Sequence, residues 1–337
     1  MMPITFSKNV FIPVTNVCRN HCAYCGFRRN ASDPESVLMS EDEVVSILRS
    51  GVSAGCTEAL FTFGEYPEED PVFLELLNEI GFSSLTGYVA HLSDIAIRLG
   101  ILPHTNGGVL SFDDLKQLAP KNASMGLMLE TTADIPAHKN CPGKEPRVRL
   151  EMIENAGILR IPFTTGILIG IGESRDDRVD SIQKIAALHE KYGHIQEVIL
   201  QNYSPKPNLS AEAAKSLGLC PPTRDEMMET IVMSREILPP DVAIQVAPNL
   251  IAPLDLIRYG VSDLGGISPV TIDYINPEAA WPKIDELRTT LASSGYEFNE
   301  RLPIHPDFVL KGWSGTETKE LVAELADENG YRKTKAI

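Results

Sequence analysis

The stretch Val10-Phe-Ile-Pro-Val14, followed by Thr15-Asn-Val-Cys18-Arg-Asn-His-Cys22-Ala-Tyr-Cys25, decides how this chain is interpreted. Its first five residues form a short apolar run, which predicts a buried strand. A polar loop follows directly and holds three cysteines with the spacing C-x₃-C-x₂-C. Such clustering indicates metal binding rather than a disulfide framework. The other cysteines, Cys56, Cys141 and Cys220, are scattered, and Cys56 and Cys220 are expected to be small buried side chains.

Beyond this loop, the chain alternates short β-rich runs with amphipathic helical segments. Strands are predicted at 10–14, 58–63, 101–104, 125–130, 163–169, 195–201, 243–247 and 263–266. Helices are predicted from Ser40, at 71–80, 85–99, 111–118, 147–156 and 176–192, from Thr223, and at 282–293. Alternation of this kind is typical of βα units and a parallel sheet. The count predicts an α/β fold, a full or partial (β/α)₈ TIM-type barrel over residues 1–310, with a charged C-terminal segment at 311–337.

Composition limits the classes of function. The formal net charge of -16 argues against nucleic acid as a partner, because phosphates require an excess of lysine and arginine. No apolar stretch is long enough to cross a bilayer, so no membrane association is expected. Met1 to Val14 lacks the pattern of a secretory signal. A soluble, cytoplasmic protein is therefore expected.

Three cysteines suit a particular kind of iron–sulfur site. Three thiolates can hold three irons of a [4Fe-4S] cluster, which leaves the fourth iron free to bind a small molecule through nitrogen and oxygen. Two alternatives remain. A zinc site needs a fourth ligand, such as His21 or a distant cysteine. A four-cysteine electron-transfer cluster would recruit Cys56 or Cys141.

The cysteine loop resembles that of the radical S-adenosylmethionine (SAM) superfamily. Its members carry the same spacing, usually with an aromatic residue before the last cysteine, which here is Tyr24. The resemblance implies that Cys18, Cys22 and Cys25 bind a [4Fe-4S] cluster at the C-terminal end of the barrel strands. It also implies that SAM binds the free iron through its amine and carboxylate, with the backbone of Tyr24 near the adenine.

Two further stretches fit the same superfamily. Phe63-Gly64-Glu65 ends the second predicted strand, where the family has a Gly-Glu element that receives the SAM ammonium. Gly166-Ile-Leu168-Ile-Gly170-Ile-Gly172-Glu173 resembles its G-x-I-x-G-x-x-E element, which supports the adenosine, with Leu168 in place of isoleucine. A dinucleotide-binding fingerprint is the alternative, but Arg175 occupies its third glycine position.

Polar residues at the ends of other predicted strands are candidates for contact with SAM or substrate. Glu130 ends the fourth strand and is a candidate catalytic or SAM-binding residue, or else an ion-pair partner of Arg147 or Arg149. Arg149 is the preferred clamp for the SAM carboxylate. The remaining candidates, for which a structural hydrogen-bonding role is equally open, are His104, Thr105, Asn106, Gln201 and Asn202.

Several stretches spread over residues 5–310 resemble one family more closely, the CofG-type subunit of deazaflavin (FO) synthases. They include Ser7-Lys-Asn-Val-Phe-Ile-Pro13, Cys25-Gly-Phe-Arg-Arg29, Pro142-Gly-Lys144, Arg160 to Glu173 and Glu300-Arg-Leu-Pro303. The resemblance implies a radical SAM lyase that removes hydrogen from 5-amino-5-(4-hydroxybenzyl)-6-(D-ribitylimino)-5,6-dihydrouracil through a 5′-deoxyadenosyl radical. Ring closure with loss of ammonia would give FO, the chromophore of a deazaflavin coenzyme.

The same resemblance implies two functional partners, a tyrosine-using FO synthase subunit and a low-potential electron donor. Other functions stay open at this point. One is a different radical SAM enzyme, such as the tyrosine-using subunit itself, a menaquinone-pathway enzyme or a biotin-synthase-like enzyme. Another is a non-enzymatic iron–sulfur or zinc protein.

Overall fold

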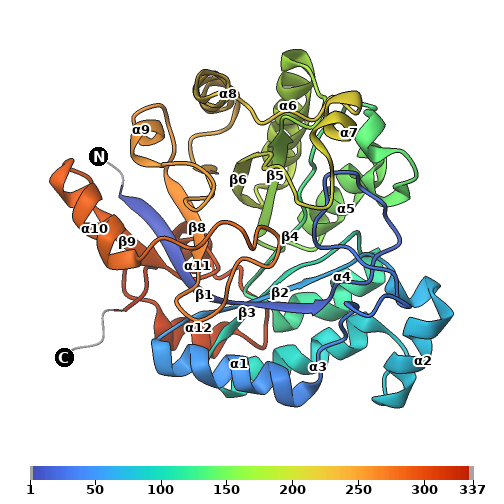
Figure 1. The fold of residues 1–337 in the computed structure, drawn as a ribbon. Coiled ribbons are helices and arrows are strands. Elements are labelled where there is room, and N and C mark those ends of the chain that lie inside the picture. The colour runs from blue at the N-terminus through green and yellow to red at the C-terminus, as the bar shows by residue number, and fades with distance from the viewer. Residues whose placement is uncertain (1–2, 334–337) are drawn as a thin grey trace.

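Eight parallel strands close into a barrel, with helices around its outside (Figure 1). The computed structural model describes residues 3–333. Each strand from β1 to β8 pairs with the next, and β1 pairs with both β2 and β8, which closes the ring. The predicted TIM-type (β/α)₈ fold is therefore confirmed.

The strands follow the predicted order with small differences in length. They are β1 Ile4–Thr15, β2 Glu58–Phe63, β3 Leu102–Asn106, β4 Ser124–Gly126, β5 Phe163–Ile169, β6 Ile195–Asn202, β7 Ala243–Gln245, β8 Asp263–Ile267 and β9 Phe298–Arg301. The structure gives β2 and β5 the predicted bounds. In contrast, β4 is shorter than predicted, and Glu130 lies beyond it, joined to Ile167 by one isolated bridge.

Helices alternate with these strands. The α-helices are α1 Glu41–Ala54, α2 Pro71–Glu79, α3 Leu85–Arg98, α4 Phe112–Leu118, α5 Pro146–Ile158, α6 Arg175–Tyr192, α7 Ala211–Ser216, α8 Arg224–Ile237, α9 Leu254–Ile257, α10 Ile284–Ser293, α11 Pro306–Leu310 and α12 Lys319–Leu325. Ser40 and Thr223 form the capping boxes that their spacing predicts, with Glu43 and Glu226. Short 3₁₀ turns follow β2 and β4, and one of them, Pro142–Lys144, contributes to the site described below.

Two parts of the fold lie outside the predicted pattern. The strand β9 pairs with the first residues of β1, so that β1 extends back to Ile4 rather than beginning at Val10. Leu302, Phe308 of α11 and Val322 of α12 share a buried apolar cluster with Leu102, the first residue of β3. Part of the segment after β9 therefore packs over the end of the barrel where the strands begin.

Within residues 3–333, no helix has the length and apolar character that crossing a membrane requires.

Candidate active site

A cavity of about 350 Å³ opens at the end of the barrel where the strands finish. Its wall includes Phe63, Asn106 and Gln201, which lie at or near the ends of β2, β3 and β6. Active sites of TIM-type barrels form at this end. The three cysteines of the C-x₃-C-x₂-C loop, Cys18, Cys22 and Cys25, all line the same cavity.

The cysteine loop is anchored on both sides of the cavity. The N–H of Arg19 donates to the carbonyl of Glu65 at 3.0 Å, which ties the loop to the end of β2. The N–H of Ala23 donates to the carbonyl of Ala137 at 3.0 Å. The side chain of Asn20 accepts the N–H of Gly143 at 3.0 Å. These contacts fix the loop between β2 and the segment that precedes α5.

Gly64 allows the loop to approach β2 closely. A Cβ atom at Gly64 would lie 1.9 Å from the carbonyl oxygen of Val17, well inside van der Waals contact. The next residue, Glu65, donates its backbone N–H to Sγ of Cys18 at 3.2 Å. The predicted Gly-Glu element therefore supports the cysteine loop through its backbone.

The surroundings of the loop thiols favour their neutral form in the protein without a metal. Burial raises the pKa of Cys18 and Cys25, and a hydrogen bond to Cys141 together with burial raises that of Cys22. Buried thiols ionise when a bound metal supplies the compensating charge. Cys141 is buried, and its contact with Cys22 places a fourth cysteine beside the loop. Cys56 is buried as expected, whereas Cys220 is exposed, contrary to its expected burial.

Four charged side chains form a network beside the cysteines. Glu130 pairs with Lys144, and Nη2 of Arg149 lies 3.7 Å from its carboxylate. Arg149 also donates to the carbonyls of Met128 and Gly143, at 2.5 and 2.8 Å, and lies 3.9 Å from Glu65. All four side chains line the cavity. Of the two alternatives for an ion pair with Glu130, the structure selects Arg149 and adds Lys144, which the sequence interpretation missed.

The charge state of Glu130 follows from this network. Burial opposes ionisation of the carboxyl group, but the charges of Lys144 and Arg149 outweigh it and lower the pKa of Glu130. Its backbone has a φ of 69°, in the left-handed region that non-glycine residues rarely adopt. Strain of this kind persists where the surrounding structure fixes a residue and is common at functional sites.

The carboxylate of Glu65 is held more tightly than the sequence indicates. Its Oε1 accepts from Nε of Arg19 at 3.0 Å, and its Oε2 accepts from the N–H of Val109 at 2.9 Å. A Cβ atom at Gly143 would lie 1.6 Å from Oε1. The side chain therefore lies under Gly143, with 3 % of Glu65 exposed. Binding of the SAM ammonium by Glu65 stays a prediction.

Tyr24 lines the cavity, and its hydroxyl group lies 2.8 Å from Nε2 of His138. Burial and the charge of Lys144 lower the pKa of His138 to about 4, so the imidazole is neutral near pH 7. The tyrosine hydroxyl can then donate to it. This hydrogen bond fixes the aromatic ring that precedes the last cysteine.

The predicted adenosine-supporting stretch contributes in two ways. Leu168 lines the cavity directly. The other residues lie behind the wall: Gly166 packs against Ile199 of β6, and Glu173 accepts the N–H of Gly170 at 2.9 Å. Glu173 also pairs with Arg178 at 2.8 Å. Gly170 and Glu173 support the turn after β5, and Gly166 allows β5 to pack closely on β6. The predicted contact of these three residues with SAM stays a prediction.

The candidates at the other strand ends separate into two groups. Asn106, Gln201 and Asn202 line the cavity. His104 lies 2.7 Å from the hydroxyl of Ser124, and burial lowers its pKa to about 4. The hydroxyl of Thr105 donates to the side chain of Asn122 at 2.9 Å. His104 and Thr105 thus make structural hydrogen bonds on β3.

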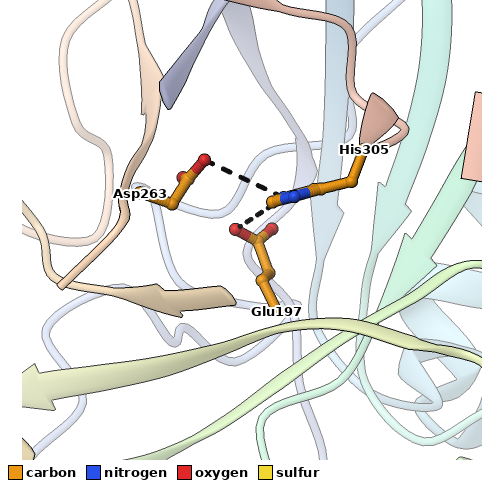
Figure 2. Close-up of side chains that lie close together, drawn as sticks. All are labelled: Glu197, Asp263 and His305. Atoms are coloured by element: carbon orange, nitrogen blue, oxygen red, sulfur yellow. Dashed lines mark ion pairs between the residues drawn. The ribbon is translucent and has the colours of Figure 1, made fainter. Parts of the chain in front are cut away.

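A second cluster of titratable residues lies where the strands begin. Glu197, Asp263 and His305 point toward one another inside the barrel, and their ligand atoms lie within 4.8 Å (Figure 2). Arg301 pairs with Asp263 at 2.6 Å and with Glu197 at 3.1 Å. Asp263 also accepts from the hydroxyl of Thr5 at 2.5 Å. Since one guanidinium already pairs with both carboxylates, the cluster is a buried ion network rather than a metal site.

Comparison with known proteins identifies the family of this chain. Residues 12–185 match the family model described as the radical SAM superfamily. A protein of Methanosarcina mazei named 7,8-didemethyl-8-hydroxy-5-deazariboflavin synthase is 56 % identical over 330 residues, which cover 98 % of this chain and 96 % of that protein. The chain belongs to the 7,8-didemethyl-8-hydroxy-5-deazariboflavin synthase family of radical SAM proteins. A family member of the same name from Archaeoglobus fulgidus is 48 % identical over 335 residues, covering 99 % of this chain and 100 % of that protein.

Solved structures share the barrel fold of this chain. The hydrogenase maturase HydG of Carboxydothermus hydrogenoformans aligns with a TM-score of 0.67 at 20 % identity, covering 97 % of this chain and 74 % of that protein. Methylornithine synthase aligns with a TM-score of 0.65 at 17 % identity, covering 88 % of this chain and 83 % of that protein. For this family, a [4Fe-4S] cluster and SAM are the implied cofactors.

Proposed function

We propose that this protein is a radical SAM synthase that forms FO from the 4-hydroxybenzyl adduct of 5-amino-6-ribitylaminouracil, releasing ammonia as a carbon–nitrogen lyase. The observation that carries the proposal is the cavity lined by all three loop cysteines, in a chain that matches FO synthases over nearly its whole length. A tyrosine-using enzyme would supply the adduct, and a low-potential donor would supply the electron.

The residues of the cavity fit the implied cofactors. Cys18, Cys22 and Cys25 would hold three irons, and the cationic side chains of Lys144 and Arg149 favour a negatively charged cluster and an anionic SAM carboxylate. When bound, the reduced cluster and SAM supply a radical that can remove hydrogen from a carbon–hydrogen bond.

The protein contributes position and shielding. The Asn20 and Glu65 contacts hold the cysteine loop, and Leu168 and Tyr24 give the cavity an apolar wall where adenosine would bind. Arg149 and Lys144 hold Glu130 ionised on the same wall. Holding the reactants in a fixed site at the end of the barrel limits side reactions of radicals with water and oxygen.

Anaerobic reconstitution tests the proposal. The iron-loaded protein should cleave SAM, and with tyrosine, the diaminouracil, a reductant and the tyrosine-using enzyme it should produce fluorescent FO. Cys22→Ala should abolish both reactions. Cys220→Ala is the matched control, because Cys220 is exposed and should be dispensable. FO formation at the native rate by Cys22→Ala would contradict the cluster assignment.

A further inference from the structure

The cavity has two chemically different halves. One half carries the cysteines and the Glu65, Glu130, Lys144 and Arg149 network, contributed by β1 to β5 and their loops. The other half follows β6, β7 and β8 and is rich in side-chain amides. These amides belong to Gln201, Asn202, Gln245, Asn249 and Asn276. If SAM occupies the charged half, the amide half remains for the substrate.

Asp273 organises the amide half. It is buried, and its Oδ1 accepts the backbone N–H groups of Ile275 and Asn276 at 2.9 and 3.0 Å. Its Oδ2 accepts the side-chain amides of Asn249 and Asn276, both at 2.9 Å. One carboxylate therefore fixes two asparagine side chains. Hydrogen bonds to one buried carboxylate restrict the rotation of both side chains.

The orientation of Asn249 follows from its partners. Its Nδ2 donates to Asp273 and to the carbonyl of Ala279 at 3.2 Å, and both of these atoms can only accept. The Oδ1 atom must therefore point away from them. It is buried, and it has no hydrogen-bond partner among residues 3–333.

Two further side chains on this wall also have a buried polar atom without a hydrogen-bond partner in the described part of the chain. Asn202 donates to the carbonyl of Leu250 at 3.4 Å, while its Oδ1 is buried without a partner. Nε1 of Trp281 is likewise buried and unpartnered. All three residues line the cavity. A buried polar atom left unpaired destabilises a protein by about 1–3 kcal/mol, so a cluster of them on a cavity wall marks a place where a ligand or ordered water completes their bonds.

The charge of this half limits the ligand further. Its lysine, Lys206, is already held by the side-chain oxygens of Asn276 and Glu278, each at 2.6 Å. Asn202, Asn249 and Trp281 therefore offer neutral groups to a ligand: two amide oxygens that accept and one indole N–H that donates. A matching ligand offers neutral donors beside an acceptor, as the N–H and carbonyl groups of a pyrimidinedione and the hydroxyl groups of a sugar alcohol do.

We infer that Asn202, Asn249 and Trp281 form the subsite for the ribitylaminouracil half of the substrate, with Asp273 as the positioning residue. The inference rests on the proposed function and adds to it the orientation of the substrate. The uracil and its polyol chain contact the β6–β8 half, and the hydroxybenzyl group extends toward the cysteines.

Two variants and a control test this subsite. Trp281→Phe removes the indole N–H but keeps an aromatic ring, and Asn249→Ala removes the amide. Trp313→Phe is the matched control, because Trp313 packs on Phe308 at the opposite end of the barrel. FO keeps both the pyrimidine ring and the ribityl chain, so its binding to the reconstituted enzyme can be followed by fluorescence anisotropy. Iron content and melting temperature establish that each variant is folded.

The subsite predicts about tenfold weaker FO binding, and a similarly raised KM for the adduct, in Trp281→Phe and Asn249→Ala. The KM for SAM should stay at the native value in both, and Trp313→Phe should behave as native. If the native enzyme forms FO but a folded Trp281→Phe binds FO and the adduct as native does, the subsite is wrong and the proposed function stands. If the native enzyme forms no FO, both fail.

Discussion

Replacing Gly143 by alanine should weaken SAM binding without removing the cluster. The new Cβ would lie 1.6 Å from Oε1 of Glu65, so the carboxylate has to move. That oxygen is bonded to Arg19 at 3.0 Å, and its neighbour to the N–H of Val109 at 2.9 Å. Each hydrogen bond to a charged group contributes about 1.5–3 kcal/mol. If the displaced carboxylate loses its predicted bond to the SAM ammonium, SAM should bind about 10- to 100-fold more weakly.

Equilibrium dialysis of SAM against anaerobically reconstituted protein measures this effect, and the KM for SAM in 5′-deoxyadenosine formation should rise in parallel. The control is Gly157→Ala in the same region of the chain. Its Cβ would lie 2.7 Å from Cγ of Tyr192, away from the cavity. This control should lower the melting temperature but leave SAM affinity unchanged. Native SAM affinity in a folded, iron-loaded Gly143→Ala protein would refute the reasoning.

Three other outcomes are expected. Cys141→Ala should retain a full cluster and SAM cleavage, measured by iron content and 5′-deoxyadenosine; loss of the cluster would make Cys141 a ligand. Arg301→Met should lower the free energy of unfolding by about 3–5 kcal/mol in denaturant titrations, because it leaves two buried carboxylates unpaired. Burial raises the pKa of Glu58 to about 7 from an ordinary value of 4.5. The stability that its protonated form contributes is present below about pH 4.5 and is lost as pH rises through 7, so native protein should lose roughly 3 kcal/mol relative to Glu58→Gln over that range. Parallel pH profiles of the two proteins would exclude this role for Glu58.

The barrel was predictable where local pattern and tertiary environment agree. The stretch Phe163–Ile169 is buried along its whole length and has its predicted bounds. The strand Phe298–Arg301 was missed, because its Phe-Asn-Glu-Arg sequence has no β pattern, and it forms only by pairing with the first residues of β1. Such a strand depends on contacts that sequence periodicity does not carry.

The site was predictable to the extent that its residues are close in sequence. The cysteine loop is local, so its spacing indicated a metal site, and its resemblance to the radical SAM superfamily indicated a [4Fe-4S] cluster that binds SAM. The tight packing around the Glu65 carboxylate requires Gly143, which is far away along the chain. The Pro-Gly-Lys sequence of that turn gave no sign of the contact. Similarly, Asn249 and Trp281 are ordinary loop residues until the barrel brings them to one wall.

Hyperfine spectroscopy of the reduced, iron-loaded protein with SAM labelled at its amine nitrogen and carboxylate oxygen would decide whether one iron is free of protein ligands. The three-cysteine site predicts that both labels couple to the cluster in the native protein, and that the coupling persists in Cys141→Ala. A cluster with thiolate on every iron and no coupling to either label, or a protein that takes up zinc alone, would contradict it.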